Sequence, residues 1–164
     1  MSRAAPIGPR PCRALAAACE GVVVQGPDPV ITGLSADSRQ VAPGFLFAAL
    51  PGLHTTGRHF VPAALAAGAV AILHDGPLDL PAGIAHLHHP QPRQALARLA
   101  AAFQGYPARQ MTMIAITGTN GKTSTAAMIE AILGQDRTDH TPRHRVGVIG
   151  TTGIRHPGVE APNP

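Results

Sequence analysis

Apolar residues follow two different spacings along the first hundred positions of the chain. Short β-branched and aromatic runs, bounded by Gly and Pro, predict strands at 22–24, 31–34, 44–50 and 69–73, with a weaker candidate at 84–88. Helical spacing or composition predicts helices at 11–19, 60–67 and 91–103; in the last, Ala95, Leu96, Leu99 and Phe103 repeat at helical intervals. Strands that alternate with helices predict an α/β fold.

The pattern breaks at residues 105–108, and we place a domain boundary there, giving domains 1–107 and 108–164. The second domain is expected to hold a strand at 111–117, a glycine-rich loop, a helix at 123–133 and a strand at 146–149. This order predicts the first βαβ unit of a P-loop-type parallel sheet. Because such a sheet needs several units to cover both faces, we expect the second domain to be incomplete and to expose apolar surface.

Composition narrows the class of protein. Of the 164 residues, 45% are hydrophobic and 13% charged, which excludes a self-repelling disordered chain. No apolar run approaches the ~20 residues of a membrane span, and no secretory leader pattern is present, so we expect a cytoplasmic protein. Cys12 and Cys19 are interpreted as apolar core residues in a reducing compartment.

The charge balance does not indicate a nucleic-acid partner. The formal net charge is +4, but the arginines are scattered and only 3% of residues are aromatic, too few for base stacking. Lysine usage is more informative, because Lys122 is the single lysine among 13 basic residues. An ammonium at this one position is expected where a compact point charge fits and a planar guanidinium does not.

Lys122 lies in the strongest motif of the chain. The apolar run 111–117 leads into Gly118, Thr119, Asn120, Gly121, Lys122, Thr123 and Ser124, and a helix is predicted to follow. Glycines between a strand and a helix let backbone N–H groups approach a phosphate, and the helix N-terminus favours an anion. Lys122 can reach the β- and γ-phosphates and the Thr123 hydroxyl can bind Mg²⁺. We therefore expect these seven residues to bind ATP, with Thr123 as the metal ligand.

The general pattern for such loops would place Gly at position 116, where this chain has Ile116. The shorter form, Gly-Thr-Asn-Gly-Lys-Thr-Ser, resembles the Mur ligase family, the ATP-dependent amide ligases of peptidoglycan synthesis. Further segments resemble the N-terminal module of the family: 36–39 (Ala-Asp-Ser-Arg), 43–44, 46–49, Gly52 and 57–61 (Gly-Arg-His-Phe-Val). The resemblance extends from about residue 30 to the end, and the Ile-Gly-Thr-Thr-Gly run at 149–153 belongs to it.

The resemblance also implies a substrate site in the N-terminal domain. It places contacts to a UDP-muramoyl substrate at Ala36 and Ser38, and at Leu53, His54 and Thr55 in the next loop. Arg39 can form a two-pronged contact with a phosphate or carboxylate, but it can equally pair with Asp37 and brace the turn. Both readings of Arg39 remain open from the sequence.

Within the family, the loop form and the 149–153 run are most similar to the members that add a diamino acid, meso-diaminopimelate or L-lysine, to UDP-MurNAc-L-Ala-D-Glu. The resemblance implies ATP and Mg²⁺ as cofactors, an acyl phosphate intermediate and a monomer. The chain is expected to be an N-terminal part that is inactive alone, with no catalytic residue of its own. Alternatives are a family member that adds a D-Ala-D-Ala dipeptide, or a non-catalytic remnant that binds a nucleotide or a UDP-sugar. A folylpolyglutamate synthetase is disfavoured, because such enzymes lack the N-terminal module that the 36–39 segment resembles.

Histidines are the remaining candidates. His86, His88 and His89 lie close in sequence, and a strand would point His86 and His88 to one face and His89 to the other. No cluster of Cys or carboxylates accompanies them, so they are interpreted as surface residues and not as a metal site. His140, His144 and His156 are expected to be exposed in polar segments.

Overall fold

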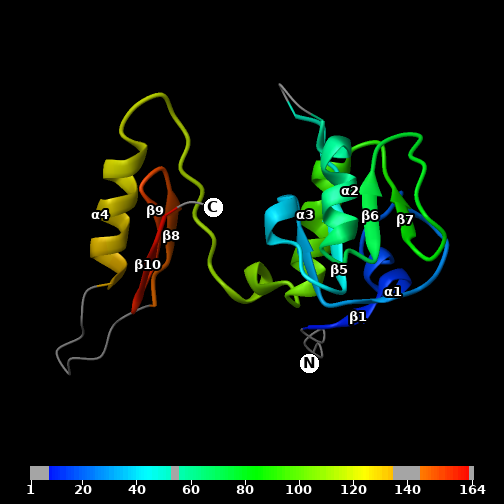
Figure 1. Ribbon diagram of the computed structural model, residues 1–164. Coiled ribbons are helices and arrows are strands. Elements are labelled where there is room, and N and C mark those ends of the chain that lie inside the picture. Colours follow the sequence, from blue (N-terminus) through cyan, green and yellow to red (C-terminus); the bar gives the residue numbers. More distant parts are fainter. Residues whose placement is uncertain (1–7, 53–55, 135–144, 163–164) are drawn as a thin grey trace. The chain divides into compact units, whose positions relative to one another are not determined.

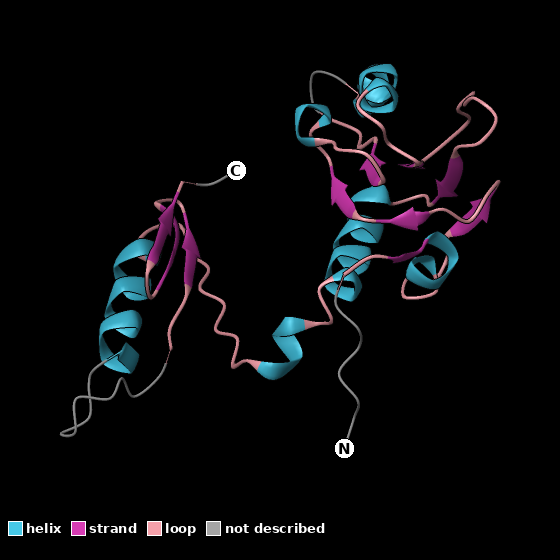
Figure 2. Cartoon of the chain, turned by 60° about the horizontal axis from the view of Figure 1, so that its bottom comes forward, coloured by secondary structure: helices cyan, strands magenta, loops and turns pink. Residues whose placement is uncertain are grey.

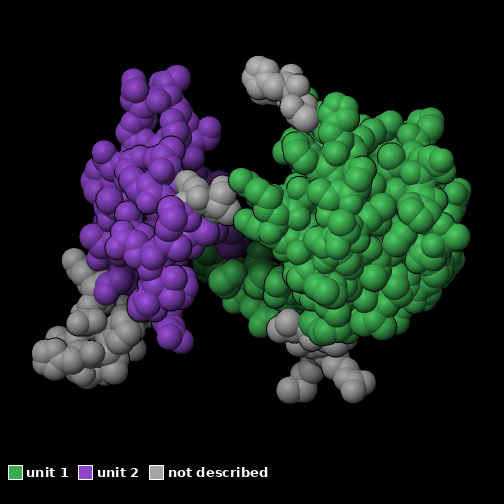
Figure 3. Space-filling model, viewed as in Figure 1, with its two compact units in different colours: residues 1–112 green, residues 113–164 purple. Residues whose placement is uncertain are grey.

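The computed structural model describes residues 8–52, 56–134 and 145–162. Contacts between Cα atoms divide the chain into two compact units, 1–112 and 113–164 (Figure 3). Each unit is described separately below. Within the described residues, no helix combines the length and the apolar character needed to cross a bilayer.

The first unit is built on a five-stranded sheet with strand order β2-β7-β6-β5-β4. Its parallel strands are β4 (Gly33–Ser35), β5 (Phe45–Ala48), β6 (Ala71–His74) and β7 (Ala85–His88), while β2 (Val23–Gln25) pairs antiparallel with β7. The mixed α/β class with a parallel sheet is thus confirmed. The single strand expected at 31–34 is two strands in different sheets, because β3 (Val30–Ile31) pairs with β1 (Arg10–Pro11) and β4 pairs with β5.

Helices cover both faces of this sheet (Figures 1 and 2). On one face, α1 (Cys12–Ala16) and α3 (Pro92–Phe103) pack with Leu46, Leu73 and other fully buried residues. On the other, α2 (Val61–Ala66) packs with a second cluster that includes Phe47 and Ile72. Alternate residues of β5 therefore enter different cores, as expected for strands buried on both sides.

The two cysteines lie in the first of these cores. Cys12 and Cys19 are both buried and both free, which confirms their interpretation as core residues. Burial raises the pKa of the Cys12 thiol to about 11, and Asp28 adds to the effect. The thiol therefore stays protonated at neutral pH and behaves as a small apolar side chain.

The second unit contains α4 (Lys122–Gly134) and an antiparallel sheet of β8 (Val148–Gly150), β9 (Gly153–His156) and β10 (Val159–Ala161). The expected helix is confirmed, but the expected strand at 111–117 is wrong, and so is the parallel βαβ pairing in the described residues. The physical reason is pairing: β8 bonds to β9, and no described strand lies beside the 111–117 run to share its backbone hydrogen bonds.

Apolar side chains of the second unit remain open to solvent. Met113, Met128 and Ile132 are 60% exposed or more, and Ile149 is 81% exposed. No side chain of α4 is buried. A 2.8 Å ion pair between Glu130 of α4 and Arg155 of β9 links the helix to the sheet. The expectation of exposed apolar surface is confirmed.

Candidate functional site

The glycine-rich loop of the second unit takes the backbone form that its sequence demands. Gly118 and Gly121 have φ angles of +145° and +78°, in the left-handed region that favours glycine. A Cβ on Gly121 would meet nothing within 4 Å, and one on Gly118 would meet only the Asn120 carbonyl oxygen at 3.6 Å. The loop backbone is therefore open to an approaching group, and residues 117–124 are exposed.

Lys122 lies at the first position of α4 and its side chain folds back over the loop. The Nζ atom donates to the carbonyl oxygens of Gly118 and, at 3.2 Å, of Thr119. Further along, the amide of Thr125 donates to the Gly121 carbonyl at 2.8 Å. The loop thus ends in the free N–H groups of a 13-residue helix with an ammonium beside them, an arrangement that attracts an anion.

A second segment approaches the loop at Thr123. The Thr123 hydroxyl oxygen lies 3.4 Å from that of Thr151, in the turn between β8 and β9. The structure therefore brings together the loop and the 149–153 run. A hydroxyl oxygen is a donor that Mg²⁺ accepts. Thr123, the ammonium of Lys122 and the exposed amides consequently fit a magnesium-bound triphosphate.

The other predicted site lies in the first unit, at the carboxyl ends of neighbouring parallel strands. The 36–39 turn follows β4, and the loop that includes 53–55 follows β5. Ligands of open α/β sheets bind at this edge. Leu53, His54 and Thr55 themselves lie outside the described residues.

Within the turn, Arg39 pairs with Asp37 in a two-pronged contact. Arg39 Nε donates to Asp37 Oδ1 at 2.9 Å, and a terminal nitrogen donates to Oδ2 at 2.7 Å. These bonds hold the pKa of the Asp37 carboxyl at about 2. The bracing role of Arg39 is therefore observed, yet its side chain is 87% exposed and still faces solvent beside half-buried Ser38 and exposed Ala36.

The base of the loop after β5 is fixed by residues that carry no site prediction. The Gly57 amide donates to the Leu50 carbonyl at 2.8 Å, and an Arg93 nitrogen donates to the Pro51 carbonyl at 3.2 Å. A Cβ on Gly57 would lie 2.5 Å from the Leu50 backbone nitrogen, so only glycine closes the loop here.

Arg58 ties the same region to the loop after β6. Its guanidinium donates to Asp75 at 2.8 Å and to the Pro77 carbonyl at 3.1 Å. The bond from Arg58 lowers the pKa of Asp75. Gly57 and Arg58 belong to the 57–61 segment, so the motif signal marked them, whereas nothing in the sequence marked Arg93.

The histidines differ partly from expectation. His86 and His88 share one face of β7, as expected, but they are half-buried and line a cavity, whereas the sequence interpretation placed them at the surface. His156 is exposed, as expected. His89 is only 6% exposed and accepts a hydrogen bond from the Gln91 amide at 3.0 Å, so its interpretation as a surface residue is wrong. It directly follows β7, and its ring lies against Gly21, where an added Cβ would be 3.2 Å from Nε2. His140 and His144 lie outside the described residues.

His74, which the sequence did not single out, is buried beside His86 and His88. Burial is the main cause that lowers its pKa, while a bond to the Gly76 carbonyl opposes the shift. As the side chains stand, no described group of three or more His, Cys, Asp or Glu residues is placed to hold a metal ion.

Comparison with protein families covers both units. Residues 30–104 match the model described as "Mur ligase family, catalytic domain", and residues 116–163 match the "Mur ligase middle domain". The first match contains the 36–39 turn and the second contains the loop at 118–124. Both predicted sites therefore lie in segments of one family.

Individual relatives agree with this. The UDP-N-acetylmuramoyl-L-alanyl-D-glutamate–2,6-diaminopimelate ligase of Gloeobacter violaceus is 40% identical over 133 residues, covering 80% of this chain and 26% of that protein. The UDP-N-acetylmuramyl-tripeptide synthetase of Roseiflexus sp. is 42% identical over 116 residues, covering 70% and 23%. A crystal structure of MurF from Acinetobacter baumannii matches with a TM-score of 0.60 and 33% identity, covering 78% of this chain and 28% of that one.

The chain thus spans about a quarter of the length of the curated relatives it matches. The matches nevertheless include the 36–39 turn, the glycine-rich loop and the strands and helix that flank them. On these grounds, the chain belongs to the Mur ligase family.

Proposed function

We propose that the natural protein carrying this sequence is an ATP-dependent ligase that joins a diamino acid to UDP-MurNAc-L-Ala-D-Glu during peptidoglycan synthesis. The observation that carries the proposal is the approximately 40% identity to diaminopimelate-adding ligases, over segments that include both predicted sites. Nucleotide-linked substrates of this kind place the activity in the cytoplasm, and we expect a monomer.

In this proposal, different parts of the chain bind the UDP-muramoyl substrate and ATP. The turn of Ala36, Ser38 and Arg39, with the loop of Leu53, His54 and Thr55, holds the UDP-muramoyl substrate. Gly118 to Ser124 hold the triphosphate of ATP. The open backbone at Gly118 and Gly121, together with the ammonium of Lys122, supports this assignment, because catalysis of phosphoryl transfer rests on positioning and on stabilising charge.

Thr123 is the residue of this chain that would hold Mg²⁺ there. Bound Mg²⁺ would neutralise phosphate charge. The overall reaction transfers a phosphoryl group to the D-glutamate γ-carboxylate, and the amine of the diamino acid then attacks the acyl phosphate and displaces phosphate. The described residues of this chain contribute binding and charge to these steps; the groups that receive the amino acid are not assigned to them.

A second candidate is a ligase of the MurF type, which adds a D-Ala-D-Ala dipeptide. The structural matches to MurF of Acinetobacter baumannii, at 33% identity, favour it. Identity to the diamino-acid-adding relatives is higher, at 38% to 45%. We therefore prefer a diamino acid as the acceptor.

A ligation assay tests the proposal. The natural protein is incubated with ATP, Mg²⁺ and UDP-MurNAc-L-Ala-D-Glu plus meso-diaminopimelate or L-lysine, and separately with the UDP-MurNAc-tripeptide plus D-Ala-D-Ala. We expect product only with a diamino acid. Product with D-Ala-D-Ala alone would establish the second candidate. Binding of nucleotide without any ligation would indicate a non-catalytic remnant and overturn the proposal.

A pair of variants tests the loop within the same assay. Lys122→Met removes the ammonium that lies over the loop, and we expect the ligation rate to fall by about a hundredfold or more, because a charge aimed at a transferred phosphoryl group is lost. Arg98→Met removes one positive charge from the exposed side of α3 and serves as the matched control. An unchanged rate in Lys122→Met would refute the role of the loop.

A further inference from the structure

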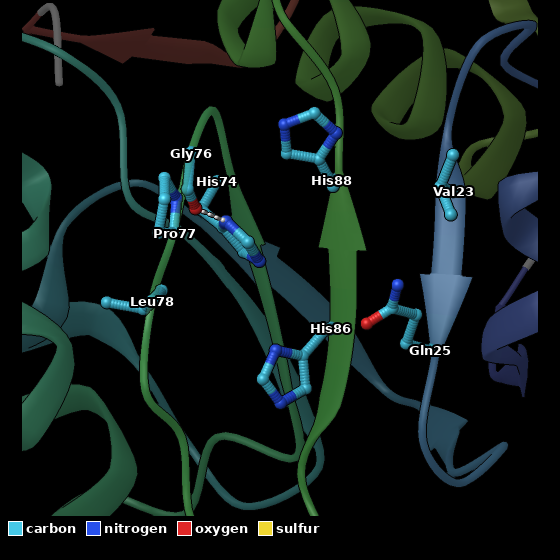
Figure 4. A pocket seen from close by; sticks show the side chains of 8 residues that line it. All are labelled: Val23, Gln25, His74, Gly76, Pro77, Leu78, His86 and His88. Atoms are coloured by element: carbon cyan, nitrogen blue, oxygen red, sulfur yellow. Dashed lines mark hydrogen bonds between the residues drawn. The ribbon is translucent and has the colours of Figure 1, made fainter.

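Three histidines gather on one sheet face of the first unit, on the strands β6 and β7. His74 ends β6, and His86 and His88 lie on the neighbouring strand β7, where His88 is the direct cross-strand partner of His74. The His74 ring lies 5.9 Å from that of His86 and 5.7 Å from that of His88, measured between centroids. Figure 4 shows the His74 ring between the other two.

These rings line a cavity of about 400 Å³. The rest of its wall comes from Val23 and Gln25 of β2 and from the segment after β6, Gly76 to Leu78 (Figure 4). None of these lining residues is a carboxylate, Lys or Arg. The nearby Asp75 carboxylate is already bonded to Arg58 at 2.8 Å. Imidazole nitrogens are therefore the principal donors that the cavity offers.

His74 holds its ring in a defined tautomer. Its Nδ1 atom lies 2.6 Å from the Gly76 carbonyl oxygen, and because a carbonyl only accepts, Nδ1 carries the proton. In the neutral ring, Nε2 then bears a lone pair. His74 is only 5% exposed, and Nε2 has no hydrogen-bond partner among the described residues. A buried acceptor without a partner is costly, so this atom points to a missing ligand.

A metal-binding imidazole has this same arrangement, since it normally donates its second ring N–H to a carbonyl or carboxylate that orients it. From Zn–N bonds of ~2 Å, two imidazoles on one tetrahedral ion have centroids roughly 5 Å apart. The observed separations of 5.7 and 5.9 Å exceed this by less than 1 Å. Among the described residues, ring contacts join His74 to His86 and to His88 but do not join His86 to His88, and as they stand the three rings are not placed to hold one ion. Binding therefore requires the half-buried side chains of His86 and His88 to change rotamer.

We propose that His74, His86 and His88 bind a transition-metal ion that prefers nitrogen ligands, with Zn²⁺ as the representative, and that water completes the coordination. The neutral, nitrogen-only donor set selects such an ion over Mg²⁺ or Ca²⁺, which prefer oxygen. The site differs in position and in donor chemistry from the loop at 118–124. Its failure would therefore leave the proposed ligase function intact.

Calorimetric titration with Zn²⁺ tests the proposal on the untagged 164-residue chain after treatment with a chelator. We expect one high-affinity Zn²⁺ per chain, and at least about a tenfold loss of affinity in His74→Ala and in His88→Ala. His59→Ala and His156→Ala remove exposed histidines that do not line the cavity, and they should bind as the parent does. Affinity that is lost in these controls instead would overturn the proposal.

A spectroscopic readout protects the test against a variant that fails to fold. In the unchanged chain, the ¹⁵N resonance of His74 Nε2 should shift on addition of Zn²⁺, while Nδ1 keeps its proton. Co²⁺ in place of Zn²⁺ should give the visible absorption of a tetrahedral site. An Nε2 resonance that stays unmoved at saturating Zn²⁺ would refute the assignment, whatever the variants do.

Discussion

The two units of the chain differ in how completely they bury their apolar side chains. In the first unit, the sheet carries a core on each face, and Phe47, Leu46 and Ile72 are fully buried. In the second, α4 buries no side chain and Ile149 is 81% exposed. The 36–39 turn therefore stands on a packed scaffold, whereas the glycine-rich loop rests on local contacts. A site in the first unit should respond to core changes that leave the second unaffected.

The largest expected effect comes from removing a core side chain of the first unit. Phe47→Ala should lower the free energy of unfolding of this unit by about 3–5 kcal/mol, because it leaves a cavity between β5 and α2. Ile149→Ala truncates an exposed side chain of β8 and should change the free energy of unfolding of the second unit by less than about 0.5 kcal/mol. Urea unfolding monitored by NMR signals of each unit measures both. Equal losses of stability in the two variants would contradict the difference in burial between the two units.

A smaller effect is expected where backbone approaches backbone. Gly57→Ala would place a Cβ 2.5 Å from the Leu50 nitrogen, and we expect about 1–3 kcal/mol of destabilisation in the first unit. Gly134→Ala, at the end of α4, meets nothing within 4 Å and should be close to neutral. Thermal unfolding of the two variants compares them. A Gly57→Ala protein as stable as the parent would show that the backbone at the base of this loop can shift to accommodate the added Cβ.

The smallest effect concerns the exposed pair at the 36–39 turn. Arg39 holds the pKa of Asp37 at about 2, below its ordinary 3.8. The ion pair therefore stabilises the turn above about pH 4, and this stabilisation is lost as Asp37 becomes protonated toward pH 2. Arg39→Gln should return the Asp37 midpoint toward 3.8.

Carboxyl ¹³C NMR titration measures this midpoint directly. Arg98→Gln, which removes a distant exposed charge, should leave it unchanged and serves as the control. A midpoint near 4 in the parent chain would mean that the pair does not persist in solution, and would favour a free Arg39 available to substrate.

Most elements of the first unit followed from local sequence. The 12 residues of α3 and the strands β5, β6 and β7 carry periodic or bounded apolar runs that neighbouring strands then bury. The split of 31–34 into β3 and β4 was missed because Thr32 gives no local signal that the chain changes sheets. In the second unit, the apolar run at 111–117 has strand composition, but a strand also needs a partner, which composition cannot supply.

Site residues show the same division. The loop glycines and Lys122 could be proposed as site residues from the sequence, because a few residue types at fixed spacing define the loop geometry themselves. Arg93 and His74 were not, since their roles depend on which carbonyl or ring lies opposite in space. His89 was misjudged for the same reason: its burial depends on residues distant in sequence, such as Gly21, where an added Cβ would lie 3.2 Å from His89 Nε2.

The use of Lys122 as the single lysine has a practical consequence. Amine-selective acylating reagents have two targets in this chain, the N-terminus and the exposed side chain that lies over the glycine-rich loop. Peptide mass spectrometry separates the two, so the extent of acylation at position 122 would report occupancy of the loop, with the N-terminal amine as an internal reference. The molecule thus carries its own covalent footprinting probe at the place where a nucleotide is expected.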